Sequence, residues 1–542
     1  MKSFTKILTV ALIGSTFLVA PVLAAKVPAG VNLAADQTFT YRALDEHSSI
    51  DPQIVEDVSG SEIVRDLFEG LLNQDGDGNL VPGVAESWEA SNGNLTYTFK
   101  LRKDAKWSNG DPVTANDFVY SWQRLADPQT ASPYAWFMEI MSLENAKDII
   151  AGDKEPSELG VSAPDDYTLV VNLTAPLPYF AAMTTHASTF PSPQKVVEEF
   201  GTAWTKPENI VSNGAYVLTE HVPNERLVRE RNPNYWNDSE TVIEKVTVLV
   251  INSDDAALTR YLAGELDRTE IPSGQYPRLK KEFPNQAISF PRLCNYYYTF
   301  NLSDSGPEAF KDVRVRKALA YSLDRSVVTE QVLKGGQFEA FTFTPAATAN
   351  FTVPDVAWGK MSQAERDAKA KELIAEAGYG NGGKPLAFEL LYNTSEGHKK
   401  IATVAAQMWK QKLGVDVTLA NQEWKVFLET RGNQNFELAR GAWCGDYNEA
   451  STMLDLLTTP SGYNDGKYSN AEVDKLMSDA KTAADASANY TKVEEILAQD
   501  MPVIPVYHYT GVYMLNEAIV GSWPVGNVEQ NWYSRDLYKV AK

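Results

Sequence analysis

The sequence predicts a mixed α/β protein with more than one domain, on three observations. Strand-like and helix-like patterns alternate along the chain, which is typical of packed layers of helices and sheets. The chain has 542 residues, 44% of them hydrophobic, enough for roughly two to three ordinary domains. No tandem repeat or low-complexity tract interrupts the alternation. We therefore expect a large globular protein built from mixed α/β layers.

The first residues have the pattern of a secretory leader. Lys2 and Lys6 precede an apolar run over residues 7–19, and residues 22–24 offer small side chains where a signal peptidase cleaves. The run is shorter than the roughly 20 residues that span a bilayer. No cysteine stands at the cleavage point to accept a lipid. We expect residues 1–24 to be a cleaved signal peptide and the mature chain to be released into a Gram-negative periplasm.

Charge and cysteine content narrow the possible partners. Removing the two leader lysines takes the formal net charge from -22 to -24, so we expect no nucleic acid or anionic membrane as partner. In an oxidising compartment, Cys294 and Cys444 are expected to form a disulfide, with two buried thiols as the alternative. The chain has no C-x-x-C motif, which argues against redox catalysis.

Two helices are expected between residues 313 and 378. One is predicted over residues 313–333. A second begins at the capping box formed by Ser362 and Glu365, runs to Ala377 and ends at Gly378. Both lie between strand-like segments, as the mixed fold requires.

The clearest supersecondary unit follows. Residues 385–392 are predicted to be a strand, residues 398–413 a helix that ends at Gly414, and residues 415–419 a second strand. This order predicts a βαβ unit with parallel strands.

The next segments place a candidate site. We expect a short helix over residues 424–431 and a strand over residues 436–440, so that residues 441–446 follow the carboxyl end of that strand. Open α/β sheets bind their ligands at such ends.

Two motifs resemble chemical sites and are interpreted otherwise. Residues 378–383 match G-x-G-x-x-G, but they follow a helix and not a strand, so we expect a helix stop and a loop. Asp75, Asp77 and Asn79 resemble the start of a calcium loop, yet Leu80 stands where glycine is needed, so a hairpin turn is expected.

No catalytic or metal motif is recognised, so we expect no enzyme activity, no cofactor and no metal site. G-x-S-x-G, the P-loop and H-E-x-x-H are absent from the sequence. The five histidines are scattered, without a pair at helical spacing: His47, His186, His221, His398 and His508. Of the 12 Trp, 25 Tyr and 21 Phe, we expect half or more to lie in the core. Aromatic residues beside charged ones in residues 440–446, however, suit the capture of an extended polar solute.

A family resemblance covers essentially the whole mature chain. The motifs that establish it are DLFEG (66–70), PGVAESW (82–88), WSNG (107–110), DFVYSWQR (117–124), NGAY (213–216), LYNTS (391–395) and NQEW (421–424). In these segments the chain resembles the periplasmic oligopeptide-binding proteins of ABC importers, extracellular solute-binding protein family 5. The family also includes murein-tripeptide-binding relatives.

The resemblance implies a periplasmic-binding-protein-like fold of class II, cluster C. Two mixed α/β lobes would clamp the ligand, and one lobe would be extra. The implied limits are residues 25–68, 194–293 and 511–542 for lobe I, 69–193 for the extra lobe II and 294–510 for lobe III. A short peptide would bind as an extended strand between lobes, and the loaded protein, expected to be a monomer, would deliver it to an inner-membrane ABC permease.

The resemblance also implies the site residues. The family holds the peptide amino group by an aspartate in a W-C-x-D-Y segment, which is residues 443–447 here, so Asp446 is the expected amine anchor. A buried carboxylate needs a cation, although an internal pair with an arginine is the alternative. The other implied contacts are main-chain groups near Ala442, Cys444, Glu56 and Val58, aromatic walls at Tyr134, Trp424, Trp443 and Tyr509, and carboxylate or water contacts at Arg65, Arg431, His398 and Arg440.

For three of these residues a purely structural role is the alternative. Arg431 and Arg440 could take the peptide carboxylate bidentately or pair with a nearby acid of the protein. His398 could contact ligand or only pack at a helix start.

Two departures leave the peptide length open. Leu333 stands where broad-range binders place a lysine for the carboxylate of a longer peptide, and the neighbouring Lys334 points about 100° away on a helix. Thr299 stands where an acid is common. Both features are similar to the murein-tripeptide binders, whereas the pair Cys294 and Cys444 is similar to the oligopeptide branch. An exported hydrolase, or a carrier for a bile acid, nickel complex or sugar, are the alternatives from other classes.

Overall fold

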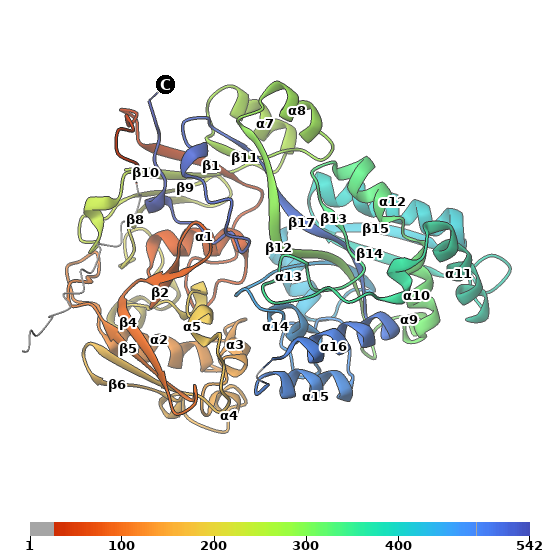
Figure 1. Ribbon diagram of the computed structural model, residues 1–542, viewed down its shortest axis with the longest axis horizontal. Coiled ribbons are helices and arrows are strands. Elements are labelled where there is room, and N and C mark those ends of the chain that lie inside the picture. Colours follow the sequence, from red (N-terminus) through yellow and green to blue (C-terminus); the bar gives the residue numbers. More distant parts are fainter. Residues whose placement is uncertain (1–26, 484, 542) are drawn as a thin grey trace, which may run out of the picture.

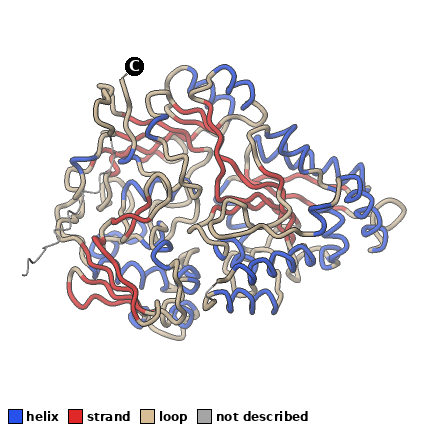
Figure 2. Tube along the Cα trace, viewed as in Figure 1, coloured by secondary structure: helices blue, strands red, loops and turns tan. Residues whose placement is uncertain are grey.

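The computed structural model describes residues 27–541 except residue 484, so the expected signal peptide lies outside the described residues. Strands run through the middle of the molecule, and further strands lie at its lower left edge, with helices packed around both groups (Figure 2). Within the described part of the chain, no helix has the length and apolar character needed to cross a membrane.

One large sheet of eleven strands extends through both halves of the molecule (Figure 1). Its strand order is β15-β14-β16-β12-β17-β11-β1-β10-β9-β8, with β13 paired to β17. The strands are β1 (Thr38–Ala43), β8 (Tyr216–Val222), β9 (Arg226–Arg231), β10 (Lys245–Val250), β11 (Arg268–Glu270), β12 (Ala287–Phe300), β13 (Phe338–Glu339), β14 (Ala387–Asn393), β15 (Asp416–Gln422), β16 (Leu438–Cys444) and β17 (Val503–Leu515).

Strands β12 and β17 connect the two halves. They have 14 and 13 residues and pair with each other along most of their length. Their register shifts between Pro291 and Asn295, where proline has no N–H to donate to a ladder. The lobe limits expected at 293/294 and 510/511 fall inside these strands, and these limits stay a prediction.

A second sheet lies within residues 69–193, the segment expected to form the extra lobe. Its order is β4-β5-β7-β6, all antiparallel. The strands are β4 (Ala85–Ser91), β5 (Thr96–Leu101), β6 (Val161–Asp165) and β7 (Thr168–Asn172), and the nearby helices are α2 (Ala115–Ala126), α3 (Ala135–Ile140), α4 (Ala146–Ile150) and α5 (Phe180–Met183).

The calcium-like motif is a hairpin turn, as predicted. Strands β2 (Leu72–Gln74) and β3 (Leu80–Pro82) pair antiparallel on either side of it. The Asp75 carboxylate accepts hydrogen bonds from the backbone N–H groups of Asp77 and Asn79, at 3.0 and 2.9 Å. The carboxylate is thus used to stabilise the turn.

The βαβ prediction is confirmed. Strands β14 and β15 are parallel, and α12 (Glu396–Leu413) connects them. The helix ends at Gly414, whose φ of 74° is a left-handed conformation that glycine adopts at low cost.

The single helix predicted over residues 313–333 is wrong. Helix α10 (Val313–Ser322) ends, and residues 327–333 form a separate π-helical segment. The buried Arg325 guanidinium donates to the carbonyls of Ala320 and Leu323, both at 3.1 Å, and so satisfies the end of α10. The Asp324 carboxylate then accepts the N–H of Ser326 at 3.1 Å, which begins the next segment.

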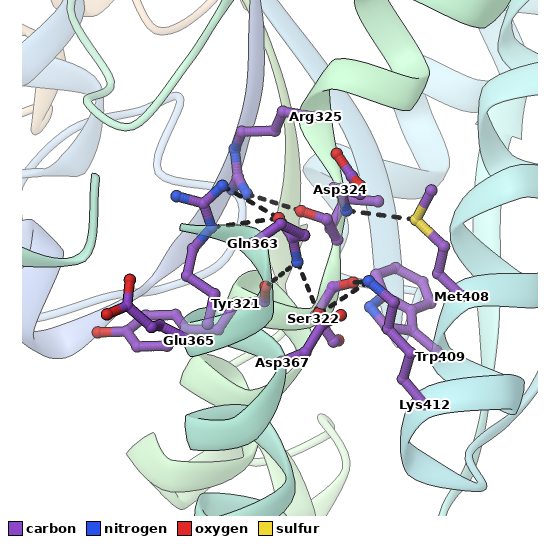
Figure 3. Close-up of polar contacts among 12 residues, drawn as sticks. Tyr321, Ser322, Asp324, Arg325, Gln363, Glu365, Asp367, Met408, Trp409 and Lys412 are labelled. Carbon is purple, nitrogen blue, oxygen red and sulfur yellow. Dashed lines mark hydrogen bonds and ion pairs between the residues drawn. The ribbon is translucent and has the colours of Figure 1, made fainter. Parts of the chain in front are cut away.

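Polar side chains hold α10 against α11 (Gln363–Glu376) and α12 (Figure 3). The Gln363 side chain donates to the Tyr321 carbonyl at 3.0 Å. Lys412 donates to the Ser322 carbonyl at 2.9 Å and pairs with Asp367 at 2.8 Å. Helix α11 begins at the predicted capping box of Ser362 and Glu365.

The remaining helices are α1 (Val58–Leu67), α6 (Gln194–Phe200), α7 (Asp254–Leu262), α8 (Tyr276–Glu282), α9 (Glu308–Lys311), α13 (Trp424–Gly432), α14 (Ser451–Leu454), α15 (Ala471–Ala480) and α16 (Ser487–Asp500). Of these, α1 and α13 matter most for function, because residues of both line the cavity described next.

Candidate ligand-binding site

A cavity of about 360 Å³ is lined by residues from distant parts of the chain. Its walls come from the segment between β1 and α1, from α13 and from β16. Every site residue predicted from the sequence lines it, namely Glu56, Val58, Arg65, Tyr134, His398, Trp424, Arg431, Arg440, Ala442, Trp443, Cys444, Asp446 and Tyr509. The structure therefore brings the whole predicted set together.

Strand β16 presents an unpaired edge to this cavity. It was expected to end at Arg440, but it continues to Cys444, because β12 pairs with it along its full length. On its other side β14 pairs only with Leu438 and Ala439. From Arg440 onward, that side has no partner strand among the described residues. Backbone groups on such an edge can pair with an added extended chain.

The disulfide is present as predicted. Cys294 of β12 and Cys444 of β16 lie directly opposite each other in the antiparallel ladder, and their sulfur atoms are bonded at 2.08 Å. The bond lies two residues before Asp446, so it links the anchor segment covalently to β12.

Asp446 is a buried carboxylate without a cationic side chain as partner. One oxygen, Oδ2, has no hydrogen-bond partner in the described protein. The other, Oδ1, lies 3.4 Å from the Tyr134 hydroxyl and 3.5 Å from Nε2 of His186. Burial raises the pKa of Asp446 well above its usual range. No arginine or lysine of the described residues forms an ion pair with it, so the expected alternative of an internal salt bridge is not observed.

His186 was not predicted as a site residue, although it lines the cavity. Its Nδ1 lies 2.8 Å from the Ser188 hydroxyl, and its ring stacks on Tyr134 with centroids 4.8 Å apart. Burial and the charge of Arg65 lower its pKa to about 3, so it is neutral beside Asp446. No sequence motif links His186 to residue 446.

The two arginines expected to bind a carboxylate differ. Arg431 forms an ion pair with Asp465 at 2.6 Å, so it has a structural partner. Arg440 is buried and donates to the Tyr509 hydroxyl at 2.9 Å and, weakly, to Asn393 at 3.3 Å. No acid of the described residues pairs with Arg440, and its Nε has no partner. Arg440 is therefore a buried cation that is available to an anionic ligand group.

Arg65 and His398 also line the cavity. Arg65 is buried, forms no ion pair among the described residues, and its pKa is lowered by burial. Nearby Glu529 has a pKa raised by burial to about 7. The backbone N–H of His398 donates to Ser395 at the start of α12, while its half-buried ring lines the cavity. Burial and Arg440 lower the pKa of His398 well below its usual range.

Aromatic rings form one wall. Tyr134 and Trp443 are nearly parallel with centroids 6.3 Å apart, and Tyr463 packs against Trp443 at 5.1 Å. Tyr463, which was not predicted, donates to Glu56 at 3.1 Å. The Trp424 indole donates to Asp57 at 2.9 Å. These two hydrogen bonds connect α13 and the segment around residue 463 with the start of α1.

Lys334 does not belong to the cavity lining. Its side chain is exposed, whereas the side chain of Leu333 is buried. Within the described residues, the lysine of broad-range binders thus has no equivalent in the cavity.

Comparisons with known proteins agree with this geometry. Residues 79–465 match the family described as bacterial extracellular solute-binding proteins, family 5 Middle. The periplasmic murein peptide-binding protein MppA of Escherichia coli is 47% identical over 521 residues, which cover 95% of this chain and 96% of that protein. The chain belongs to this family. The resemblance and the fold class predicted from the sequence are confirmed.

Solved structures of family 5 proteins differ in how closely they match. Haemophilus influenzae OppA in complex with the peptide RPPGFSPFR has a TM-score of 0.89 at 44% identity, covering 94% of this chain and 100% of that chain. The unliganded open form of MppA has a TM-score of only 0.69 at 45% identity, covering 95% and 99%. At nearly equal identity, the arrangement of this structure is nearer to the peptide complex than to the open form.

Proposed function

We propose that this family 5 protein binds short peptides in the periplasm and delivers them to an inner-membrane ABC permease. The observation that supports it most is a cavity that contains both an unpaired buried carboxylate, Asp446, and an unpaired buried guanidinium, Arg440. Leaving such charges unpaired in a closed site is costly, so each requires a ligand group of opposite charge. A zwitterionic peptide has one of each.

The strand edge supports a peptide over other zwitterions. Within the described residues, Arg440 to Cys444 of β16 have no partner strand on the side away from β12, and Glu56 and Val58 line the same cavity. An extended peptide would add to this edge through main-chain hydrogen bonds, which do not depend on its side chains. The aromatic wall of Tyr134, Trp443 and Tyr463 would contact ligand side chains.

The remaining parts of the proposal come from the sequence and from the comparisons. The protein would act as a monomer that releases its peptide unchanged, after export through a cleaved signal peptide at residues 1–24. Binding would close the lobes, in line with the difference in likeness to the open form of MppA.

A murein tripeptide is the second candidate ligand. It is favoured because, among the described residues, no lysine lines the cavity: Lys334 is exposed outside it and Leu333 is buried. Because that lysine would meet the carboxylate of a longer peptide, its absence favours a short peptide whose carboxylate lies near Arg440.

The test is native mass spectrometry of the protein purified from its own periplasm without unfolding. A ladder of adducts at the masses of mixed short peptides supports general peptide uptake. One dominant adduct at the mass of a murein tripeptide supports the second candidate. A single non-peptide adduct would overturn both.

A further inference from the structure

A second cluster of polar side chains is formed by Glu46, His47 and His221, and of these Glu46 also lines the cavity that contains Asp446. Glu46 and His47 stand in the loop after β1. His221 stands near the end of β8, which is separated from β1 in the sheet by β10 and β9. Glu46 and His47 are buried, and the His221 side chain is 22% exposed. Folding thus joins residues that the sequence analysis treated as scattered.

Both imidazoles point a nitrogen at the same carboxylate oxygen. Nε2 of His221 lies 2.9 Å and Nδ1 of His47 lies 3.3 Å from Oε1 of Glu46. All three atoms lie within 4.8 Å of one another, and the ring centroids are 5.0 Å apart. Ligands about 2.0 Å from a tetrahedral zinc ion are about 3.3 Å from each other, so small side-chain shifts suffice to place an ion between these atoms.

The surroundings orient the carboxylate. Oε2 of Glu46 accepts the backbone N–H of Asn224 at 2.6 Å, which leaves Oε1 directed at the histidines. Hydrogen bonds of this kind fix the ligands of many metal sites. Partial exposure of His221 gives an ion a path from solvent.

The charges suit a cation. Burial lowers the pKa of His47 to about 4. The positive groups His221 and Lys425 lower it further, whereas the carboxylates of Glu46 and Asp57 raise it. Burial opposes ionisation of Glu46, but the hydrogen bond from His221 and the neighbouring groups lower its pKa to about 2. Independently of these shifts, one carboxylate oxygen and two imidazole nitrogens lie close enough together to share one ion.

We propose that Glu46, His47 and His221 bind one late first-row divalent metal ion, with zinc as the expected ion. Two imidazoles and one carboxylate are a ligand set that such ions prefer, and a water molecule would complete the tetrahedron. This site goes beyond peptide binding, although one of its ligands, Glu46, also lines the cavity assigned to the peptide. The competing explanation is a triad held together by hydrogen bonds alone.

The test uses untagged full-length mature protein that has been treated with a chelator and dialysed. Zinc is titrated calorimetrically, and cobalt(II) is titrated while its visible absorption is recorded. We expect one ion per chain and the intense bands of tetrahedral cobalt. H47Q and H221Q should each weaken zinc binding by at least about 100-fold and abolish these bands.

The matched control is E225Q. Glu225 lies in the turn after β8, is exposed and pairs with Arg226, so its loss removes a nearby charge without removing a ligand. E225Q should bind zinc within about 3-fold of wild type, as expected for a screened surface charge. Circular dichroism of the metal-free variants checks folding, and E46Q replaces any histidine variant that does not fold. Absence of zinc binding, or binding that both histidine variants retain, would overturn the proposal.

Discussion

Replacing Asp446 by asparagine should remove most of the peptide affinity while keeping the shape of the site. The wild-type carboxylate is buried, and its Oδ2 has no hydrogen-bond partner in the described protein. A ligand ammonium would therefore pair with this carboxylate away from water. Breaking a buried charge pair on one side costs about 3 to 5 kcal/mol, which corresponds to roughly 100- to 5,000-fold in Kd.

The same residue predicts a pH dependence. Burial raises the pKa of Asp446, so the empty site binds a proton that an incoming ammonium must displace. Each pH unit below that ligand-free pKa removes about 1.4 kcal/mol of affinity. Wild-type affinity should therefore increase up to about tenfold per unit as pH rises, until the peptide amine itself loses its proton near pH 8. D446N should lack the rising limb.

The assay is isothermal titration with trialanine from pH 5 to 8, in buffers of different ionisation enthalpy. Proton release on binding makes the wild-type enthalpy depend on the buffer, and D446N should lose that dependence. D455N is the matched control, because Asp455 is also a buried acid with a pKa raised by burial, to about 6, but it lies outside the cavity lining. A loss below about 1 kcal/mol in D446N, the range of an exposed pair, would refute Asp446 as the amine anchor.

Three further outcomes are expected. R440Q should weaken binding of a free-carboxyl peptide by about 1.5 to 3 kcal/mol but change binding of the amidated peptide far less, and equal losses in titration would contradict a carboxylate contact. W424F removes the 2.9 Å hydrogen bond to Asp57, so we expect about 1 kcal/mol weaker peptide binding and faster dissociation in stopped flow, and an unchanged off-rate would contradict a role in closure. Replacing Cys294 and Cys444 by serine should lower the free energy of unfolding by about 4 to 5 kcal/mol in denaturant titrations, given the 150-residue separation. Unchanged unfolding and peptide affinity would show that the bond neither stabilises the fold nor positions the anchor.

Local signals made parts of the fold predictable. The capping box at Ser362 and the stop at Gly414 act within one helical turn, so the sequence alone locates them. The break after α10 depends instead on Arg325, whose guanidinium also donates to the distant carbonyls of Ala340 and Pro505, at 2.6 and 2.9 Å for Nε. Periodicity cannot report such long-range contacts, and the predicted helix was therefore too long.

The candidate site was also predictable only in part. The predicted lining residues came from family motifs, and they do line one cavity, whereas composition and spacing alone would not have selected Asp446. His186 and Tyr463 were missed because each reaches the site from a segment without a motif. Likewise, nothing in the spacing of His47 and His221 indicates that a four-strand stretch of sheet brings them to one carboxylate.

The passage of β12 and β17 through both halves of the molecule limits how the protein can be divided. A fragment of residues 294–510 would keep the pairing of Cys294–Phe300 with β16 and β17, but it would lose the pairing of residues 287–291 with residues 510–514. We therefore expect the two halves to fold together, and partial proteolysis in the loops should leave them attached to each other as a nicked complex.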